Sequence, residues 1–166
     1  MGRLVYALAF VAVAVSAAVI VATSADLPPM VASHFGTGGV VKGTMPRDDY
    51  RVLMLTLAVV MPAAILLALA VLPRILPGVV NVPNARAWLA SPQREATLAT
   101  LGLRGALFAI LLTAFICAVH LTIVRANVAT PARLDAAMLG VIVGAFMLAV
   151  AAWVLALVLR FRKPPP

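Results

Sequence analysis

The sequence is poor in charged residues. Asp, Glu, Lys and Arg make up 11% of its 166 residues, whereas an ordinary soluble domain carries about 25%. So small a charged fraction cannot cover the surface of a soluble globule, which excludes a cytosolic domain. Cysteine is almost absent as well, since Cys117 is the single one, and this excludes a scaffold held together by disulfides.

Catalytic motifs are also missing. The sequence contains no HExxH or GxSxG pattern and no glycine-rich loop that would cradle phosphates. Ser33 and His34 are neighbours in sequence, which does not make a catalytic triad. We therefore expect a protein that is not an enzyme.

Apolar residues, by contrast, are abundant. They make up 64% of the chain, with a mean hydropathy of +1.13, and this excludes a disordered protein. Four runs are long enough to cross the ~30 Å hydrocarbon core of a bilayer, which takes about 20 residues: 4–23, 52–72, 105–124 and 136–159. Backbone groups in lipid must pair within their own segment, so these runs predict helices. The fold class is therefore all-α integral membrane, a four-helix bundle forming a single membrane domain over 1–166.

The first run is 20 residues long, longer than the 7–15 residues of a secretory signal. We interpret it as an uncleaved anchor. The four runs leave a first loop at 24–51, a second at 73–104, a third at 125–135 and a tail at 160–166.

The net charge of +8 would suggest nucleic-acid binding in a soluble protein, but no aromatic platform or dense basic helix accompanies it. It is better explained by orientation, because Lys and Arg concentrate on the cytoplasmic side. With the N-terminus inside, the inner segments carry a net charge of +7 and the outer loops +1. The inner charges are Arg3, Arg74, Arg86, Arg94, Glu95, Arg104, Arg160, Arg162 and Lys163; the outer ones are Asp26, Lys42, Arg47, Asp48, Asp49, Arg51, Arg125, Arg133 and Asp135. We expect both termini in the cytoplasm and no nucleic-acid partner.

The loop 24–51 has the pattern of a small structured cap. Residues 30–35 alternate loosely, residues 36–39 are a glycine-rich turn, and residues 40–42 are suited to pair back as a second strand. This predicts a β-hairpin between the first two spans. Thr44 is predicted to cap the second helix and Pro46 to lie in its first turn, where Asp48 and Asp49 complement the helix dipole.

The same loop carries a family resemblance. Its marks are Leu27-Pro28, His34-Phe35, Gly39, Met45-Pro46-Arg47 and Tyr50, with Asn81-Val82-Pro83-Asn84 and Trp88-Leu89 further on. Together they resemble the bacterial membrane family called domain of unknown function 1648. That family is related to the N-terminal part of immunity proteins against the sporulation-delaying toxin. The resemblance implies a bacterial cytoplasmic membrane protein whose motif residues are Leu27, Pro28, His34, Phe35, Gly39, Pro46 and Arg47.

The second and third loops contain helix caps. Asn84 is predicted to cap a short turn with Trp88, which suits the headgroup layer, and Ser91-Pro92 to start a helix that runs into the third span. Asp135 is predicted to cap the fourth span. Arg86, Arg94 and Arg104 are candidates for contact with anionic headgroups of the lipid bilayer.

Two histidines are the candidates for chemistry. His34 lies in the predicted cap, and His120 lies near the outer end of the third span, where an ionisable group marks a site by default. We expect His120 to pair with His34, Asp26 or Asp135. Ligand binding, pH sensing and a structural role all remain open for these residues. We expect no cofactor, with a metal such as zinc or copper as the alternative, for which the two imidazoles are weak candidates.

Small residues indicate where helices pack. A stripe of small and polar residues follows one face of the third span, namely Gly102, Ala106, Ala109, Thr113, Cys117 and His120, and is typical of close helix contact. Pro62 is predicted to kink the second helix. Gly140 and Gly144 predict either a homodimer seam or packing against the chain's own helices.

These observations favour a non-enzymatic membrane protein of the immunity or envelope-sensing class. It would act through its outer loop on a peptide or a membrane-protein partner. The alternative is a small transporter or metal-handling subunit that uses His34 and His120.

Overall fold

The computed structural model describes residues 2–90 and 92–163. It is mostly helical, and four of its helical stretches are long and apolar enough to span a membrane, together with a small two-stranded sheet. These stretches are α1 (Gly2–Ser24), Arg47–Ile75, α5 (Arg94–Val128) and α6 (Ala136–Phe161). The four helices and the hairpin predicted from the sequence are thus confirmed, although every helix is longer than its apolar run.

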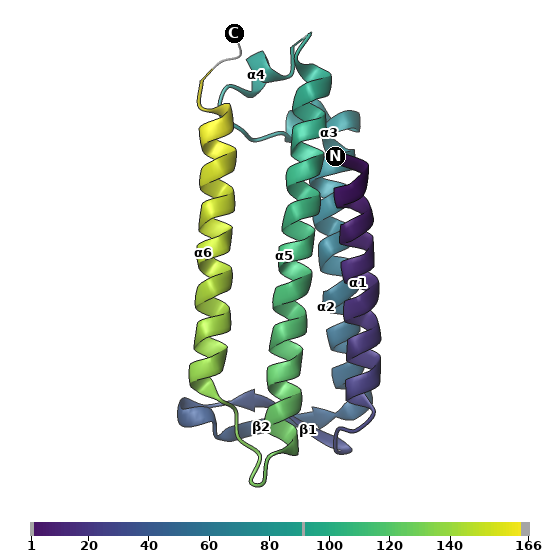
Figure 1. Ribbon diagram of the computed structural model, residues 1–166, viewed down its shortest axis with the longest axis vertical. Coiled ribbons are helices and arrows are strands. Elements are labelled where there is room, and N and C mark those ends of the chain that lie inside the picture. Colours follow the sequence, from purple (N-terminus) through teal and green to yellow (C-terminus); the bar gives the residue numbers. More distant parts are fainter. Residues whose placement is uncertain (1, 91, 164–166) are drawn as a thin grey trace.

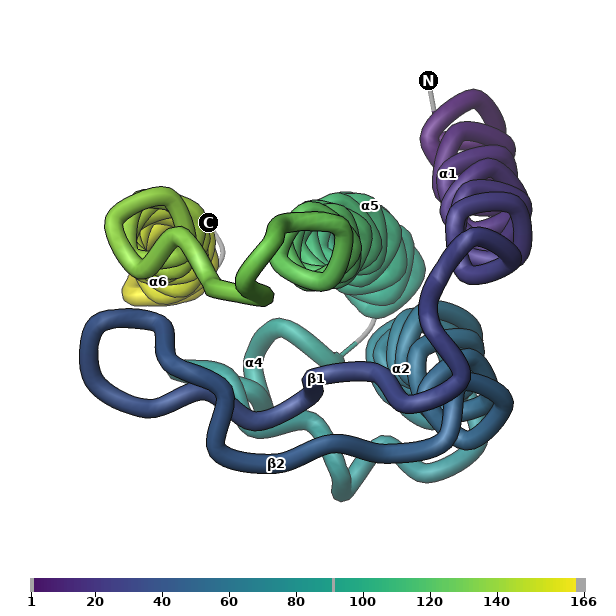
Figure 2. The backbone as a smooth tube through the Cα atoms, turned by 90° about the horizontal axis from the view of Figure 1, so that it is seen from below, coloured from purple at the N-terminus to yellow at the C-terminus, as the bar shows by residue number. Residues whose placement is uncertain are grey.

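The helices stand side by side with one small layer across one end (Figure 1). We call this the hairpin end, where α1 and α5 finish, α2 and α6 begin, and β1 (Met30–Phe35) and β2 (Val41–Pro46) lie. The opposite end, which we call the connector end, holds the start of α1 and of α5 and the end of α6. Seen from the hairpin end, α6, α5 and α1 form a row with α2 beside it, and the hairpin crosses from α2 toward α6 (Figure 2).

The hairpin is longer on its second strand than the sequence predicted. The antiparallel register runs from Met30 opposite Pro46 to Phe35 opposite Val41, with irregularities on both sides of His34. Thr44 pairs with Ala32 inside the sheet, so its predicted role as a helix cap is wrong. Pro46 stands one residue before α2 (Arg47–Leu66) instead of in its first turn, because the strand continues up to the helix. Asp48 and Asp49 lie in that first turn as predicted.

Helix α2 continues past Pro62, which is buried within it. The chain then widens into a π-helical turn, Leu67–Val71, and ends as α3 (Leu72–Ile75). Single π-turns inside α-helices are rare and occur frequently at functional sites. Here the turn faces α5, where Gly105 approaches Leu69.

Helix α1 packs along α5 through small residues. Gly102, Ala106, Ala109, Thr113 and His120 are all buried and Cys117 is half-buried, so the predicted stripe is a packing face. On α1 the buried residues are Ala9, Ser16, Ile20 and Ser24. Side chains this small let two backbones approach closely, which is how helices associate in lipid.

Helix α6 packs on the other side of α5, and over the described residues it has no extensive contact with α1 or α2 (Figure 2). Aromatic pairs join it to α5: Phe115 stacks on Phe146 with ring centroids 4.1 Å apart, and Phe108 meets Trp153 at 4.9 Å. A Cβ placed on Gly140 or Gly144 would meet nothing within 4 Å. Packing of these glycines against the chain's own helices is therefore wrong, and the homodimer seam stays a prediction.

Residues at the connector end cap the C-terminal end of α6. Before α4 (Ala85–Trp88), Asn84 has a positive φ of 56° and no side-chain bond to that helix. Its amide donates instead to the carbonyls of Phe161 and Arg162, at 3.2 and 2.9 Å, which are acceptors left over at a helix end. Trp88 is buried against Phe161 and donates to its carbonyl. The indole of Trp88 thus serves as a helix cap, and its place in the headgroup layer stays a prediction. The predicted cap Ser91 lies outside the described residues.

Helix α5 extends to Val128, which shortens the third loop predicted at 125–135. Asp135 caps α6 as predicted, since its Oδ1 accepts from the backbone N–H of Met138 at 2.9 Å.

Candidate functional site

A buried polar network lies beneath the hairpin and joins three helices. His120 of α5 is 0% exposed and Tyr50 of α2 is 1% exposed. The Nδ1 atom of His120 lies 2.9 Å from the hydroxyl of Tyr50, and its Nε2 atom lies 2.7 Å from the hydroxyl of Thr23 in the last turn of α1. The two rings also stack, with centroids 5.7 Å apart.

The proton positions of this network follow from its donors. The hydroxyl of Thr23 donates to the carbonyl of Val19 at 2.8 Å, so toward His120 it acts as an acceptor. Nε2 of His120 therefore carries the proton and donates to Thr23, which leaves Nδ1 to accept from the hydroxyl of Tyr50. In this arrangement every polar atom of the network is satisfied with His120 neutral.

Apolar side chains enclose the network. Ile20, Leu27, Val31, Met54 and Ile116 form one buried cluster together with Tyr50. These residues come from α1, the turn after it, β1, α2 and α5, so the hairpin contributes directly to the enclosure. A buried hydrogen-bonded chain of this kind fixes helix positions, because breaking any link leaves a polar group without a partner.

At its base, the hairpin is held by Arg47. The guanidinium donates to the carbonyls of Ala25 and Leu27, at 3.0 and 3.1 Å, and the backbone N–H of Arg47 donates to Pro29 at 2.9 Å. Arg47 thereby ties the start of α2 to the turn that follows α1.

At its middle, the hairpin is held by Asn127 of α5. Its Oδ1 accepts from the N–H of Ala32 at 2.7 Å, and its Nδ2 donates to the Ala32 carbonyl at 3.0 Å and to Ile123 at 2.9 Å. Because one amide satisfies both backbone groups of Ala32, it pairs with the outer edge of β1 as a neighbouring strand would.

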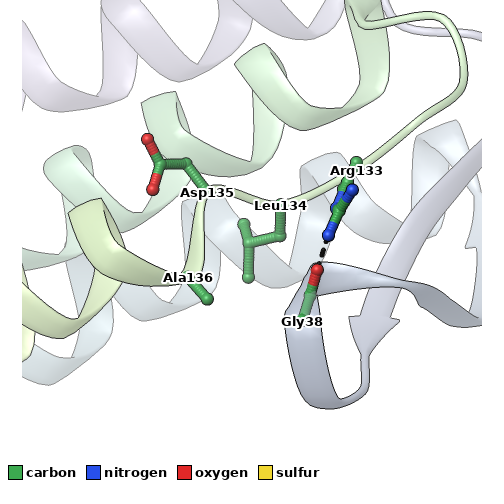
Figure 3. Close-up of a pocket in the computed structure, with 5 residues that line it drawn as sticks. All are labelled: Gly38, Arg133, Leu134, Asp135 and Ala136. Carbon is green, nitrogen blue, oxygen red and sulfur yellow. Dashed lines mark hydrogen bonds between the residues drawn. The ribbon is translucent and has the colours of Figure 1, made fainter.

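At its tip, the hairpin is held by the loop before α6. The N–H of Leu134 donates to the carbonyl of Gly39 at 2.9 Å, and Nε of Arg133 donates to that of Gly38 at 2.9 Å (Figure 3). Gly39 has a φ of +77°, and a Cβ there would collide with the Leu134 carbonyl. Only glycine fits this contact. An open cavity of about 460 Å³ lies beside it, lined by Gly38, Arg133, Leu134, Asp135 and Ala136.

The structure separates the residues that the sequence had grouped. The predicted pairing of His120 with His34, Asp26 or Asp135 is wrong, since Tyr50 and Thr23 take both of its ring nitrogens. His34 is exposed on the hairpin, with Nδ1 3.1 Å from the hydroxyl of Ser33. Asp26 is exposed, and Asp135 caps α6.

Within residues 2–90 and 92–163, no three His, Cys, Asp or Glu side chains gather as a metal site requires. His34 and His120 therefore do not share a ligand set in this structure. Each ring nitrogen of His120 already has a hydrogen-bond partner, so a metal would have to displace Tyr50 or Thr23.

Three residues of the site escaped the sequence analysis. In the sequence, Thr23 is only the last residue of the first apolar run and Asn127 only a position in the third loop, while Tyr50 enters through the family resemblance alone. A single polar residue at a span end gives no sign of its partner. One signal was available, because Asn127 falls seven residues after His120 and so lies on the same face of α5.

The fold and the site define a multi-pass helical membrane protein. At one end, its spans meet a β-hairpin that is held by hydrogen bonds to the neighbouring helices and loop. No protein-family model matches the sequence, and neither a curated protein nor a solved structure is significantly similar to it.

Proposed function

We propose that the chain is a non-enzymatic protein of the bacterial cytoplasmic membrane, of the immunity or envelope-sensing class. It acts through the hairpin, which meets a peptide or a membrane-protein partner. The observation that carries the proposal is that hydrogen bonds hold the hairpin at three places, at Arg47, Asn127 and Gly39. A two-stranded hairpin alone is marginally stable, so this fastening gives a partner a fixed surface to recognise.

The motif residues of the family resemblance include some that build the hairpin and one that is exposed on it. Leu27 is buried, Arg47 ties the base and Gly39 fits the tip, so these three build the hairpin. His34 is exposed and carries a side chain able to donate, accept or take up a proton. We assign partner recognition to His34 and to the exposed Lys42 of the facing strand.

A non-catalytic role is supported by the enclosure of His120. General acid–base work needs a group within reach of a substrate, whereas His120 has no exposed surface and both of its nitrogens are bonded. We assign to this network the structural role of holding α1, α2 and α5 in register below the hairpin.

The proposed orientation places the hairpin outside and both termini in the cytoplasm. Eight basic residues belong to the connector end or its flanks and five to the hairpin end, in keeping with the positive-inside tendency. Four of the five are engaged with acceptors of the same chain, namely Arg47, Arg51, Arg125 and Arg133.

Labelling with a membrane-impermeant maleimide tests this orientation. In a Cys117→Ser background, Thr37→Cys at the hairpin tip should react in intact cells, and Arg86→Cys at the connector end only after lysis. The reverse pattern would overturn the orientation.

The function itself is tested in a sensitive bacterial host that expresses the protein and is challenged with membrane-active peptide toxins. Protection should be lost with His34→Ala and retained with Thr37→Ala, an exposed residue of the same hairpin. Equal thermal stability of the two purified variants would show that the loss is one of recognition. Full protection by His34→Ala combined with Lys42→Ala, or no protection by the unaltered chain, would contradict the proposal.

A further inference from the structure

Two cavities near the connector end share one lining residue, Tyr6 of α1. The first, of about 300 Å³, lies between the start of α1, α3 and α5; its lining is Gly2, Tyr6, Arg74, Ala99, Thr100 and Leu103. The second, of about 420 Å³, is an apolar groove between α1 and α2; its lining is Tyr6, Ala9, Phe10, Val13, Val59, Ala63 and Leu66. The second volume falls within the usual range for ligand sites, about 300–1,000 Å³.

The two cavities follow one face of α1. Gly2, Tyr6, Ala9 and Val13 recur at spacings of three and four residues, which places them in one line along a helix. From Gly2 to Val13 the line rises by eleven steps, or roughly 16 Å at 1.5 Å per residue. That length is about half of the ~30 Å hydrocarbon core, so the face runs from the end of the span to the middle of the membrane.

The chemistry changes along this line. At the end of the span, Arg74 is exposed and one of its guanidinium nitrogens donates to the carbonyl of Ala70; a guanidinium has five N–H groups in all. Arg94 lies beside it, since its Nη2 donates to the Arg74 carbonyl at 3.4 Å, and Arg94 pairs with Glu95 at 3.3 Å. The hydroxyl proton of Thr100 is donated to Ala96 at 2.8 Å, and Arg74 is the cationic side chain in the lining of the first cavity.

We propose that the two cavities form one binding site for a single anionic phospholipid. Its phosphate is held by Arg74, and one acyl chain lies in the groove between α1 and α2, passing Tyr6. Three features match this ligand together: a cation at the membrane boundary, an apolar groove directly below it, and a combined length of one leaflet. A soluble anion would use only the first cavity, and a hydrocarbon without a headgroup only the second.

Native mass spectrometry of the purified full chain tests the site, with phosphatidylglycerol as the probe and phosphatidylcholine of identical chains as the comparison. We expect retention of one phosphatidylglycerol in preference to phosphatidylcholine. Arg74→Gln should weaken phosphatidylglycerol binding about five-fold, the share of one basic residue near the membrane surface. Arg86→Gln, which removes an exposed charge of the same end, should leave the binding unchanged.

A second pair of variants tests the acyl chain. Ala63→Phe fills the groove and should reduce the retention of both lipids, whereas Ala64→Phe, at an exposed neighbour outside the lining, should not. Equal losses for Arg74→Gln and Arg86→Gln would mean diffuse attraction by the surrounding lipid and would overturn the headgroup site. Retention unaffected by Ala63→Phe would overturn the groove, and equal retention of the two lipids would overturn the choice of an anionic ligand.

Discussion

The two sides of α5 hold their neighbours in different ways. Toward α1, the contact consists of small residues along the whole helix and ends in the hydrogen bonds of His120. Toward α6, it consists of the aromatic pairs Phe115–Phe146 and Phe108–Trp153 and of one hydrogen bond, from the indole N–H of Trp153 to the backbone carbonyl of Arg104 at 3.0 Å. Lipid tails are as apolar as leucine, so helices in a bilayer must gain their association from close packing and hydrogen bonds. The α1 side combines close packing of small residues along its length with a hydrogen bond between His120 and Thr23 at the hairpin end.

The difference shows where each helix gets its position. Helix α6 is fastened at its two ends, by Gly39 of the hairpin at its start and by Asn84 and Trp88 at its finish. The loops at both ends therefore add to the contacts with α5 in positioning α6, whereas the position of α1 depends mainly on the spans themselves. Damage to the polar network should loosen α1, and damage to the hairpin tip should loosen α6.

The largest effect is expected from His120→Ala. It opens a cavity and leaves the hydroxyl of Tyr50 without its acceptor, at a cost of about 3 kcal/mol in the free energy of unfolding. Reversible unfolding in detergent measures this cost, with Leu121→Ala at an exposed neighbouring position as the control. A loss no larger than that of the control would show that the network does not hold α1.

The number and order of the four long helices could be predicted from the sequence, because apolar run length is a property of each segment alone. Their full lengths could not, since every helix extends beyond its apolar run. The hairpin could also be predicted, since its turn is marked by glycines. The extent of β2 could not, because nothing local distinguishes Thr44 in a strand from Thr44 as a helix cap. Thr44 lies in a strand because it pairs with Ala32, whose other edge is hydrogen-bonded to the amide of Asn127. Both of these are tertiary contacts.

The candidate site, too, could be predicted from the sequence only in part. His120 stood out because an ionisable residue in an apolar run is rare, but its partners did not. The acids that were expected to pair with it lie in loops, where water solvates them, and a neutral histidine needs only hydroxyl groups. Tyr50 and Thr23 supply these from helix ends that the packing of α1 on α5 brings together.

Gly39→Ala is expected to have the next largest effect. A methyl group there collides with the Leu134 carbonyl and strains a backbone with a φ of +77°, at a cost of about 2 kcal/mol. Hydrogen exchange should rise at the amide of Leu134, which donates to Gly39, and at the start of α6. Gly78→Ala is the matched control, since a Cβ there meets nothing within 4 Å. Unchanged protection of Leu134 would show that the tip does not position α6.

Phe146→Leu tests the α6 side of the comparison. It removes the stacked contact with Phe115 while keeping an apolar side chain, so the expected loss is about 1 kcal/mol. Met147→Leu, at an exposed neighbour, is the control in the same unfolding measurement. A loss as large as that of His120→Ala would abolish the distinction between the two sides of α5.

The smallest effect is expected from Tyr50→Phe, and it sharpens the account of the α1 side most. The stacked ring is retained and only the hydroxyl donor to Nδ1 of His120 is lost, at about 0.6 kcal/mol, the average for hydrogen bonds between membrane helices. Since the hydroxyl of Thr23 donates to Val19, Nε2 of His120 must keep its proton in this variant. The ¹⁵N shifts of the His120 ring in a reconstituted sample distinguish the two neutral forms. A proton on Nδ1 in the unaltered protein would contradict this assignment, because each hydrogen bond of His120 would then run in the opposite direction. Nδ1 would donate to the hydroxyl of Tyr50 instead of accepting from it.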